Sequence, residues 1–204
     1  MNNLNNLTVI IVTYKTDYKI LKDCVKSIHK NVKVKIIENS FKNEKNNFLI
    51  EKIENLTVNY TGKNLGYGGG NNHGFGLTDT DYVIVANPDI TFHKTFFENV
   101  EKYLDKDLDF TIIGSSYEND KKFSSSGLFK ENEKKEYKKE VTSKSGKLFN
   151  DLNKVDWVTG CMMLINLNKF NTKKIFDDFF FLYFEEFDLC KSIELKNENV
   201  FCAN

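Results

Sequence analysis

Three acidic residues follow a dense aromatic run in the last part of the chain. Glu185, Glu186 and Asp188 come directly after the run Phe179–Phe184. Aromatic neighbours partly desolvate a carboxylate, and nearby like charges oppose its ionisation, so both effects raise its pKa. A carboxylate with a raised pKa is a good general base near neutral pH. The same residues also fit the acidic first turn of a helix, which the helix dipole favours. The residues alone leave both interpretations open.

A second candidate site is the tripeptide Asn87-Pro88-Asp89, which follows the apolar run Tyr82–Ala86. Pro88 is the only proline in the chain. It lacks an N–H, so a strand ladder cannot continue through it. Ligands of open α/β sheets bind outside the carboxyl ends of the strands. Asp89 is therefore expected where a metal ion or a phosphate is handled, although Asn-Pro-Asp is also an ordinary turn.

A glycine-rich segment runs from Asn64 to Gly76. It does not match the dinucleotide-binding fingerprint, because Asn71 occupies the position of the third glycine. It does not match the P-loop pattern either, since Asn64 follows the only Gly-Lys pair, Gly62-Lys63. Two interpretations remain. One is a loop that lets backbone approach a ligand and opens a helix whose N–H groups favour anions. The other is a plain glycine-rich turn.

The elements that must position these residues alternate between strands and helices. Apolar runs predict strands at 8–12, 34–37, 56–60, 82–86, 110–114 and 157–165, and amphipathic patterns predict helices near 17–28, 44–54, 96–104, 168–175 and up to about 196. The first helix is expected to be capped by Thr16 or Asp17 and to bury Ile20, among others, on its apolar face. This alternation predicts an α/β fold with a mostly parallel central sheet flanked by helices. We expect one domain over residues 1–204, with a polar, flexible, lysine-rich excursion at about 117–154.

Composition limits the classes of function. The 204 residues include 29 acidic and 29 basic residues, which gives no nucleic-acid footprint. Every basic residue is lysine, so no arginine fork is available to clamp a phosphate. The four cysteines form no CxxC pair, which favours free thiols and a cytoplasmic protein. No apolar run approaches the length that spans a membrane.

Six short motifs follow one another along the chain. They are Val12-Thr13-Tyr14-Lys15, Glu38-Asn39-Ser40, Asn64-Leu65-Gly66 through Asn72-His73-Gly74, Asn87-Pro88-Asp89, Trp157-Val158-Thr159-Gly160-Cys161, and Phe184-Glu185-Glu186-Phe187-Asp188-Leu189-Cys190. Each motif alone has low specificity, so the evidence lies in the order of all six along the chain. In that order the chain resembles the family 2 inverting glycosyltransferases of the GT-A (nucleotide-diphospho-sugar transferase) fold, in particular their bacterial rhamnosyltransferase-like branch.

The resemblance implies a nucleotide-binding set: Thr13, Tyr14, Glu38, Asn64, Gly66, Asn72 and Asn87. Within it, Thr13, Tyr14 and Glu38 would line the nucleobase and ribose pocket. The donor would be a dTDP-sugar or a UDP-sugar, and the likeness to rhamnosyltransferases suggests dTDP-rhamnose. The acceptor would be a glycan or a lipid-linked sugar in surface-polysaccharide assembly.

The resemblance also implies the catalytic parts. Asp89 matches the last residue of the family's metal-binding motif, so Mg²⁺ or Mn²⁺ would bridge the diphosphate there. Glu186 matches the catalytic base, with Glu185 and Asp188 in the same cluster. Trp157 and Gly160 would lie on the acceptor and donor-sugar side.

Two departures from the family pattern keep other functions open. Lys191 and Ser192 stand where the family often has an arginine, and none of the three histidines follows the last helix. One alternative is therefore a nucleotide- or glycan-binding module of the same fold with impaired catalysis. A nucleotidyltransferase of related architecture is a further alternative.

The aromatic run Phe179–Phe184 and the lysine-rich excursion have two interpretations. They could contact the inner membrane face, as peripheral proteins do. In the interpretation we favour, the aromatic side chains belong to the core and the lysines are solvated.

Overall fold

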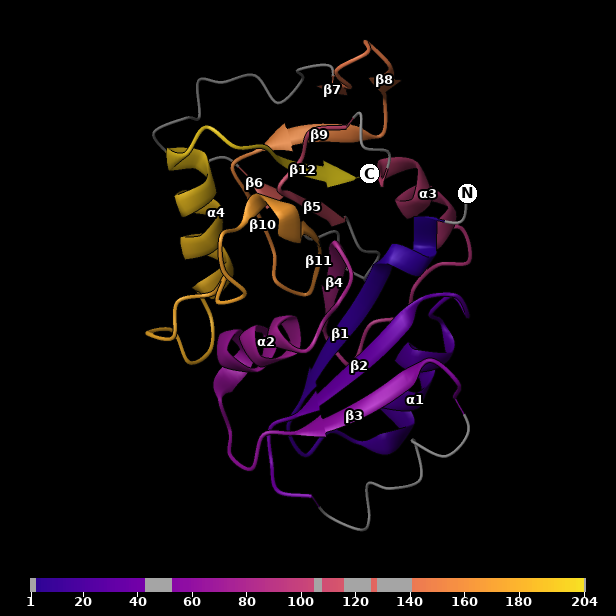
Figure 1. Cartoon of the computed structure of the whole chain (residues 1–204), viewed down its shortest axis with the longest axis vertical. Coiled ribbons are helices and arrows are strands. Elements are labelled where there is room, and N and C mark those ends of the chain that lie inside the picture. The colour runs from indigo at the N-terminus through magenta and orange to yellow at the C-terminus, as the bar shows by residue number, and fades with distance from the viewer. Residues whose placement is uncertain (1–2, 43–52, 105–107, 116–125, 128–140, 204) are drawn as a thin grey trace.

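The computed structural model describes residues 3–42, 53–104, 108–115, 126–127 and 141–203 (Figure 1). These residues build an eight-stranded sheet in the order β3-β2-β1-β4-β11-β5-β12-β9. Its strands are β1 (Leu7–Thr13), β2 (Lys33–Glu38), β3 (Leu56–Tyr60), β4 (Tyr82–Ala86), β5 (Ile112–Ser115), β9 (Leu152–Val155), β11 (Met162–Asn166) and β12 (Val200–Ala203). The first four are mutually parallel, as are β5 and β12, while β11 and β9 run antiparallel to their neighbours. The predicted α/β fold with a mostly parallel sheet is confirmed.

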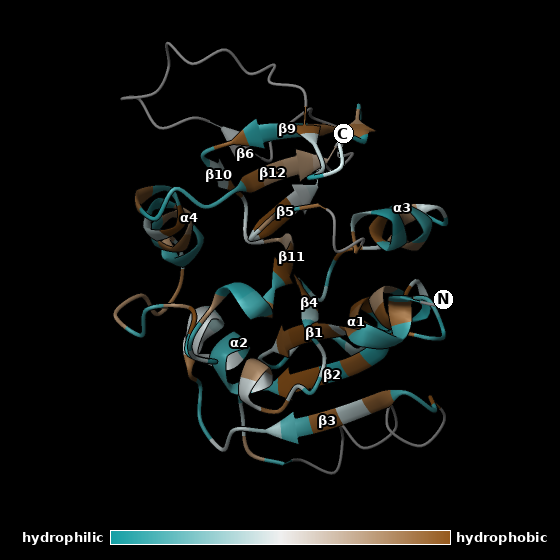
Figure 2. Cartoon of the chain, turned by 45° about the horizontal axis from the view of Figure 1, so that its top comes forward, coloured by the Kyte–Doolittle hydropathy of each residue, from teal (hydrophilic) through white to brown (hydrophobic). Residues whose placement is uncertain are grey.

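The centre of the sheet is apolar on both faces. All five residues of β4 are buried, and so are six of the seven residues of β1. Because both faces of a central parallel strand are covered, it reads as a continuous apolar run, which is what made these strands recognisable in the sequence. The brown ribbon of β1 in Figure 2 reflects this composition.

Helices cover both faces of the sheet (Figure 2). The helices α1 (Tyr18–Lys26) and α3 (Phe96–Tyr103) pack on one face, and α2 (Gly66–Gly76) and α4 (Glu185–Leu195) pack on the other. Alternate residues of β1 point to opposite faces of the sheet. Val9 and Ile11 pack toward α1 and α3, and Ile10 packs toward α2 and α4.

In α1 the predicted cap is confirmed, but the predicted buried face is only partly correct. Asp17 caps α1 as predicted, because its carboxylate accepts a hydrogen bond from the Lys19 N–H at 2.7 Å. Ile20, expected inside, is 47% exposed, so that expectation is wrong. The buried stripe consists of Leu21, Cys24 and Val25, which is narrower than the sequence suggested.

The second half of the chain differs more from expectation. The strand expected at 157–165 is divided into β10 (Trp157–Val158) and β11, with a turn at Gly160-Cys161 between them. In place of the helix expected at 168–175 there is only a 3₁₀ turn, Leu167–Lys169. The helix expected at 44–54 falls almost wholly outside the described residues, and β12 was not foreseen.

The segment expected as a flexible excursion contains regular structure wherever it is described. Strand β6 (Ser126–Gly127) pairs with β10, and β7 (Val141–Thr142) pairs with β8 (Leu148–Phe149). Strand β9 closes one edge of the main sheet through its pairing with β12. Residues 116–125 and 128–140 of this segment lie outside the described part of the chain.

Glycine 74 lets α2 approach the sheet closely. A Cβ at Gly74 would lie 2.8 Å from Cγ2 of Ile10 and 3.2 Å from Cγ1 of Ile37, and both isoleucines are fully buried. A Cβ at Gly76, in the same helix, would meet nothing within 4 Å. The two glycines therefore form a matched pair for testing the α2–sheet contact.

We expect Gly74→Ala to lower the free energy of unfolding by about 1–3 kcal/mol, because the added methyl overpacks a buried layer. Gly76→Ala should be neutral or stabilising by up to about 1 kcal/mol, because alanine restricts the unfolded chain. Urea unfolding of both variants measures the difference. Equal stabilities for the two variants would contradict the close packing of α2 on β1 and β2.

Candidate active site

A buried carboxylate lies where β1 and β2 end. Glu38, only 5% exposed, accepts hydrogen bonds from the Thr13 hydroxyl and the Ser40 hydroxyl, each at 2.7 Å. An ionised carboxylate has about four acceptor sites, so it can still accept from a ligand. The structure thus brings together Thr13 and Glu38, two residues of the expected nucleobase and ribose pocket.

Two tyrosines lie at the carboxyl ends of β1 and β3, the strands on either side of β2. Tyr14, just beyond β1, is 47% exposed, and the Lys15 ammonium lies 5.1 Å from its ring centroid. Tyr60 is paired with Glu38 in the register of β2 and β3. Burial, followed by the charge of Glu38, raises the pKa of Tyr60, and its hydroxyl has no hydrogen-bond partner among the described residues. Sequence analysis missed Tyr60, because its role comes from a cross-strand position that no local motif records.

Asn39 joins the end of β2 to the start of α2. Its side chain, 1% exposed, donates to the Gly66 carbonyl at 2.8 Å, and the Gly66 N–H donates to Asn64 Oδ1 at 3.0 Å. Gly66 has a φ of +74°, and a Cβ there would lie 2.0 Å from the Phe181 carbonyl oxygen. Only glycine satisfies both conditions. The glycine-rich segment is itself the helix α2, rather than a loop placed before one.

Asn72, which the resemblance puts in the nucleotide-binding set, is hydrogen-bonded to the loop before α4. Its Oδ1 accepts from the backbone N–H groups of Ile175 and Phe176 at 2.9 and 3.0 Å. Its Nδ2 donates to the Phe176 carbonyl at 2.8 Å. Through these bonds the Asn72 side chain positions the loop before α4.

Asp89 follows β4 near two thiols. Burial and then the charge of Asp89 raise the pKa of Cys24 to about 12, and burial is also the largest cause of the raised pKa of Cys161. The Asn87 N–H donates to the Cys161 carbonyl at 2.9 Å, which ties the end of β4 to the turn before β11. Burial and the charge of Asp89 thus favour the protonated form of both thiols.

The metal expected at Asp89 has a small donor set. Among the described residues, no group of three or more His, Cys, Asp or Glu side chains could hold a metal ion. One carboxylate suits Mg²⁺ or Mn²⁺ only when substrate phosphates and water supply the other ligands, which is common for Mg²⁺. The residues fit an ion that binds together with a diphosphate and do not form a preformed cage.

The acidic cluster occupies the first turn of α4. Glu185 is buried (4% exposed), Glu186 is half-buried, and Asp188 is exposed. Burial, followed by the charge of Glu186, raises the pKa of Glu185, as the sequence predicted for a carboxylate of this cluster. The Oε2 atoms of Glu185 and Glu186 are buried and have no hydrogen-bond partner within the described part of the chain. Asp188, in the same helical turn, is exposed to solvent.

Tyr67 links the acidic cluster to the rest of the site. Its hydroxyl donates to the Gly160 carbonyl, and its backbone N–H donates to the Phe181 carbonyl at 3.0 Å. Burial raises the pKa of Tyr67, and the charges of Glu185, Cys161 and Glu186 add to that rise. The chain gave one signal for Tyr67, its place directly after Gly66, and sequence analysis did not use it.

Trp157 and Gly160, which the resemblance would put on the acceptor and donor-sugar side, lie beside the first turn of α4. The Trp157 ring stacks on Phe187, with centroids 4.5 Å apart and planes inclined by 29°. A Cβ at Gly160 would lie 3.6 Å from Cβ of Glu186 and 3.6 Å from the Tyr67 hydroxyl. These are ordinary van der Waals distances, so the turn at Gly160 packs against the first turn of α4 and against Tyr67.

The expectation that the aromatic run is part of the core is wrong. Phe179 is 85% exposed, Tyr183 70% and Phe184 68%. Tyr183 and Phe184 have φ angles of 69° and 71°, which turn the chain sharply just before α4. A non-glycine residue in this region costs roughly 1–3 kcal/mol, and such residues cluster at functional sites.

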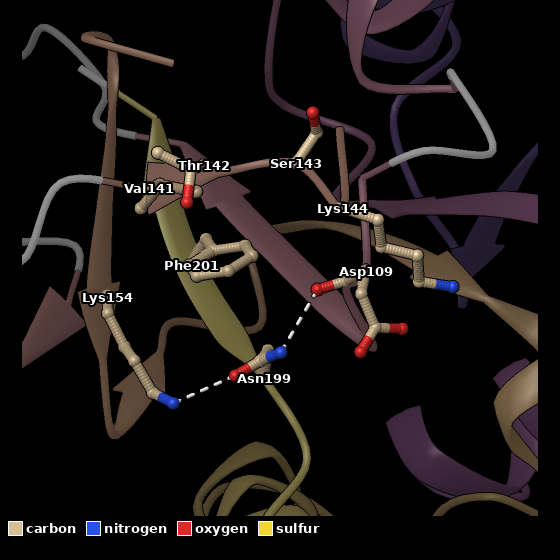
Figure 3. Close-up of a pocket in the computed structure, with 8 residues that line it drawn as sticks. All are labelled: Asp109, Val141, Thr142, Ser143, Lys144, Lys154, Asn199 and Phe201. Carbon is tan, nitrogen blue, oxygen red and sulfur yellow. Dashed lines mark hydrogen bonds between the residues drawn. The ribbon is translucent and has the colours of Figure 1, made fainter. Parts of the chain in front are cut away.

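A separate pocket lies at the other edge of the sheet (Figure 3). It has a volume of about 270 Å³ and is lined by residues of β7, β9 and β12 and of the connections next to them. Lys154 Nζ donates to Asn199 Oδ1 at 2.8 Å, and Asn199 Nδ2 donates to the Asp109 carbonyl at 3.1 Å. None of the residues that line it was expected in the active site.

Comparison with known proteins places the chain in a family. The family described as Glycosyl transferase family 2 matches residues 8–180, which is most of the chain, so the chain belongs to that family. No curated protein sequence matches it.

Solved structures share the fold at low sequence identity. TarS 1-349 of S. aureus in complex with UDP has a TM-score of 0.67 and 16% identity, over 97% of this chain and 60% of that one. GalNAc-T7 with UDP, GalNAc and Mn²⁺ has a TM-score of 0.66 and 10% identity, over 97% and 42%. The mannosyltransferase PcManGT of Pyrobaculum calidifontis, in complex with GDP-Man and Mn²⁺, has a TM-score of 0.63 and 10% identity, over 96% and 53%. The chain is thus similar to GT-A glycosyltransferases and spans 42–60% of their length.

The raised pKa of Glu185 predicts a pH-dependent stability. The Glu185 carboxyl keeps its proton to a higher pH in the native state than in the unfolded chain. Between the ordinary and the raised pKa, the native state therefore binds more protons than the unfolded state. The contribution of Glu185 to the free energy of unfolding therefore falls as pH rises through that window. Glu185→Gln should remove this contribution and gain stability over the wild type as pH rises.

Urea unfolding of the wild type and Glu185→Gln between about pH 4 and pH 8 measures the effect. Asp188→Asn is the matched control, since Asp188 is exposed in the same helical turn. A stability difference between wild type and Glu185→Gln that stays constant over this range would contradict the raised pKa.

Proposed function

We propose that this chain transfers a sugar from a nucleoside diphosphate donor to a hydroxyl group, with inversion at the anomeric carbon. The observation that carries the proposal is the pair of glutamates at the start of α4, whose Oε2 atoms are buried and unpartnered among the described residues. They lie beside the Gly160-Cys161 turn, which on its other side approaches Asp89. One site thus has carboxylates to accept a proton and a separate carboxylate for the diphosphate side.

Glu186 is the general base of this proposal. As its carboxylate takes the proton of the acceptor hydroxyl, the acceptor oxygen attacks the anomeric carbon from the face opposite the nucleotide. The bond between that carbon and the diphosphate oxygen breaks, and the nucleoside diphosphate leaves with its electron pair. Glu185, which is more buried, carries the raised pKa and positions its neighbour at the helix start.

The nucleotide would lie at the carboxyl ends of β1 and β2, where Thr13 and Glu38 form a hydrogen-bonded pair. Tyr14 and Tyr60 add aromatic surface at that end. Neighbouring folds hold UDP in TarS and GDP-Man in PcManGT, which supports a nucleoside diphosphate donor here. A dTDP- or UDP-sugar donor, a hexosyl or rhamnosyl group and an acceptor of surface-polysaccharide assembly complete the proposal.

A divalent metal ion would neutralise the leaving diphosphate. Asp89, with Asn87 at the same strand end, would hold it together with the phosphate oxygens. The Mn²⁺ in the structures of GalNAc-T7 and PcManGT supports this part. Since the chain has no arginine, lysines and backbone N–H groups are the other sources of positive field, so the ion's share is expected to be large.

A second candidate function is nucleotide binding without efficient transfer. It is favoured by one observation at α4. Lys191, near the position where the family often has an arginine, forms a 3.1 Å ion pair with Glu194. The Glu194 carboxylate therefore partly neutralises the Lys191 charge within the same helix. The two experiments below separate this function from transfer.

Thermal unfolding with nucleotides tests the donor site. UDP, dTDP or GDP should raise the melting temperature by mass action, by about 2.7 kcal/mol at 100 times Kd, on the order of 5–10 °C for a chain of this size. Mn²⁺ alone should have little effect, and Mn²⁺ with the nucleotide should exceed the nucleotide alone. Asp89→Asn should lose that extra gain. Asp79→Asn, which changes an exposed carboxylate just before the same strand, is the control. A large shift with Mn²⁺ alone would contradict a metal that binds only with the diphosphate.

Glu186→Gln tests the base. We expect it to lower the release of nucleoside diphosphate from UDP-glucose or dTDP-rhamnose by about 10²–10⁴-fold, with unchanged nucleotide affinity, because only proton transfer is removed. Glu194→Gln, two turns further along α4, should keep full activity. Full activity in Glu186→Gln would show that another group takes the proton. Nucleotide binding without turnover in the wild type would favour the second candidate function.

A further inference from the structure

One side of α1 carries a row of lysines. Lys19, Lys22 and Lys26 lie at positions i, i+3 and i+7 of the helix, so their side chains leave the same side of it. Two more lysines flank the helix, one before its N-cap and one after its last turn. We call these five residues the lysine face: Lys15, Lys19, Lys22, Lys26 and Lys30. All of them are exposed except Lys22, which is half-buried.

The protein does not neutralise the charge of the lysine face. Among the described residues, no carboxylate forms an ion pair with any of its five ammonium groups. Lys33, in the following strand, differs because it is paired with Asp79 at 2.9 Å. Residues 14–35 contain seven lysines against two aspartates, Asp17 and Asp23. Positive charge is therefore in clear excess on this part of the surface.

Charge is unevenly distributed between the two sides of the molecule. Helix α1 lies on the face of the sheet that it shares with α3, and α4 lies on the opposite face (Figure 2). The segment 175–190, which leads into α4, contains five acidic residues and no lysine. The formal charge of the whole chain is zero. An anionic surface would therefore orient the molecule with α1 towards it, through the charge distribution and not through the net charge.

An apolar side chain lies among these charges. Ile20, next to Lys19, is 47% exposed. The Lys22 ammonium lies 5.6 Å from the ring centroid of Tyr18, so its aliphatic stem runs along a half-buried ring. Long lysine side chains can place their ammonium groups at lipid headgroups while an apolar neighbour enters the boundary of the acyl chains. The surface thus fits a partner that offers both anionic groups and an apolar layer.

We infer that the lysine face docks on an anionic lipid bilayer, with its ammonium groups at the headgroup phosphates and Ile20 at the boundary with the acyl chains. Clusters of four to eight basic residues on such a helix are typical of this contact. A nucleic-acid duplex fits less well, because it offers no apolar layer and the chain has no arginine to clamp its phosphates. The lysine face is separate from the aromatic run and from the lysine-rich segment 117–154. The inference does not depend on the proposed function.

Co-sedimentation with vesicles of equal parts phosphatidylglycerol and phosphatidylcholine tests the inference. The protein should bind these vesicles at low salt. It should not bind pure phosphatidylcholine vesicles, and it should leave the anionic ones at about 0.5 M salt, where charges are screened beyond about 4 Å. The triple variant Lys19→Gln/Lys22→Gln/Lys26→Gln should bind about 100-fold more weakly, since each lysine near an anionic surface strengthens binding about fivefold.

A second triple variant is the matched control. Lys144→Gln/Lys173→Gln/Lys196→Gln removes the same charge from exposed lysines outside the lysine face, so it should bind the vesicles like the wild type. Ile20→Ser tests the apolar part of the contact and should weaken vesicle binding by about fivefold, because a half-exposed isoleucine loses its place in the bilayer boundary. Thermal unfolding of each variant confirms that it is folded.

Several results would overturn the inference. The first two are no binding to the anionic vesicles at low salt and an equal loss in both triple variants. Unchanged vesicle binding by Ile20→Ser would refute the apolar contact. Binding of a DNA duplex that the Lys19/Lys22/Lys26 variant loses, without vesicle binding, would assign the surface to nucleic acid. Self-association that this variant abolishes would assign it to the acidic side of a second copy. The melting-temperature shift with UDP or dTDP, measured on the same samples, reports the donor site separately.

Discussion

The contact between α2 and the loop before α4 is the constraint on which the candidate site depends. Tyr67 bonds to Phe181 and Gly160, and Asn72 bonds to residues 175 and 176. Gly66 makes room for the loop, since any Cβ there would collide with its backbone. One helix thereby fixes the loop, the turn at Gly160 and, through them, the carboxylates of α4. Asn39 extends the same connection to the nucleotide side, where it holds the first residue of α2.

This arrangement explains why α2 is so rich in glycine. A helix with six buried residues, four of them glycine, is a poor helix by intrinsic propensity. Its glycines instead allow close approach: Gly70 to Val12 and Asn39, Gly74 to Ile10, and Gly68 to Phe176. Tertiary contact, rather than helix propensity, stabilises it. From the sequence the glycines indicated either backbone approach to a ligand or a plain turn, and in the structure they mainly allow close packing between elements of the protein.

The first half of the fold was predictable because its signals are local. Strands β1 and β4 are nearly continuous apolar runs, and β3 alternates apolar and polar residues. The predicted limits of all three agree with the structure to within a residue or two. The second half depends on partners far along the chain. Strand β12 has only four residues and follows a polar stretch, so nothing nearby distinguishes it. The aromatic run was wrongly predicted to be buried, because its hydrophobicity alone favours burial. The left-handed turn at Tyr183 and Phe184 contains no glycine, so the sequence did not indicate it. At the site, the sequence identified Glu38, Asp89 and the acidic cluster, which are short motifs. It missed Tyr60 and Tyr67, whose roles arise only when separate strands and helices meet.

The position of β12 has a consequence for how the molecule assembles. This strand lies between β5 and β9, and its pairing joins Val200 to Ile112 and to Val155. Until residues 200–203 leave the ribosome, β5 has an open edge and β9 has no strand to join in the main sheet. Contacts between residues far apart in the sequence form slowly, and unpaired strand edges can associate with other chains. Completion of this sheet must therefore wait until residues 200–203 have been synthesised, and the nascent chain is exposed to aggregation until that moment.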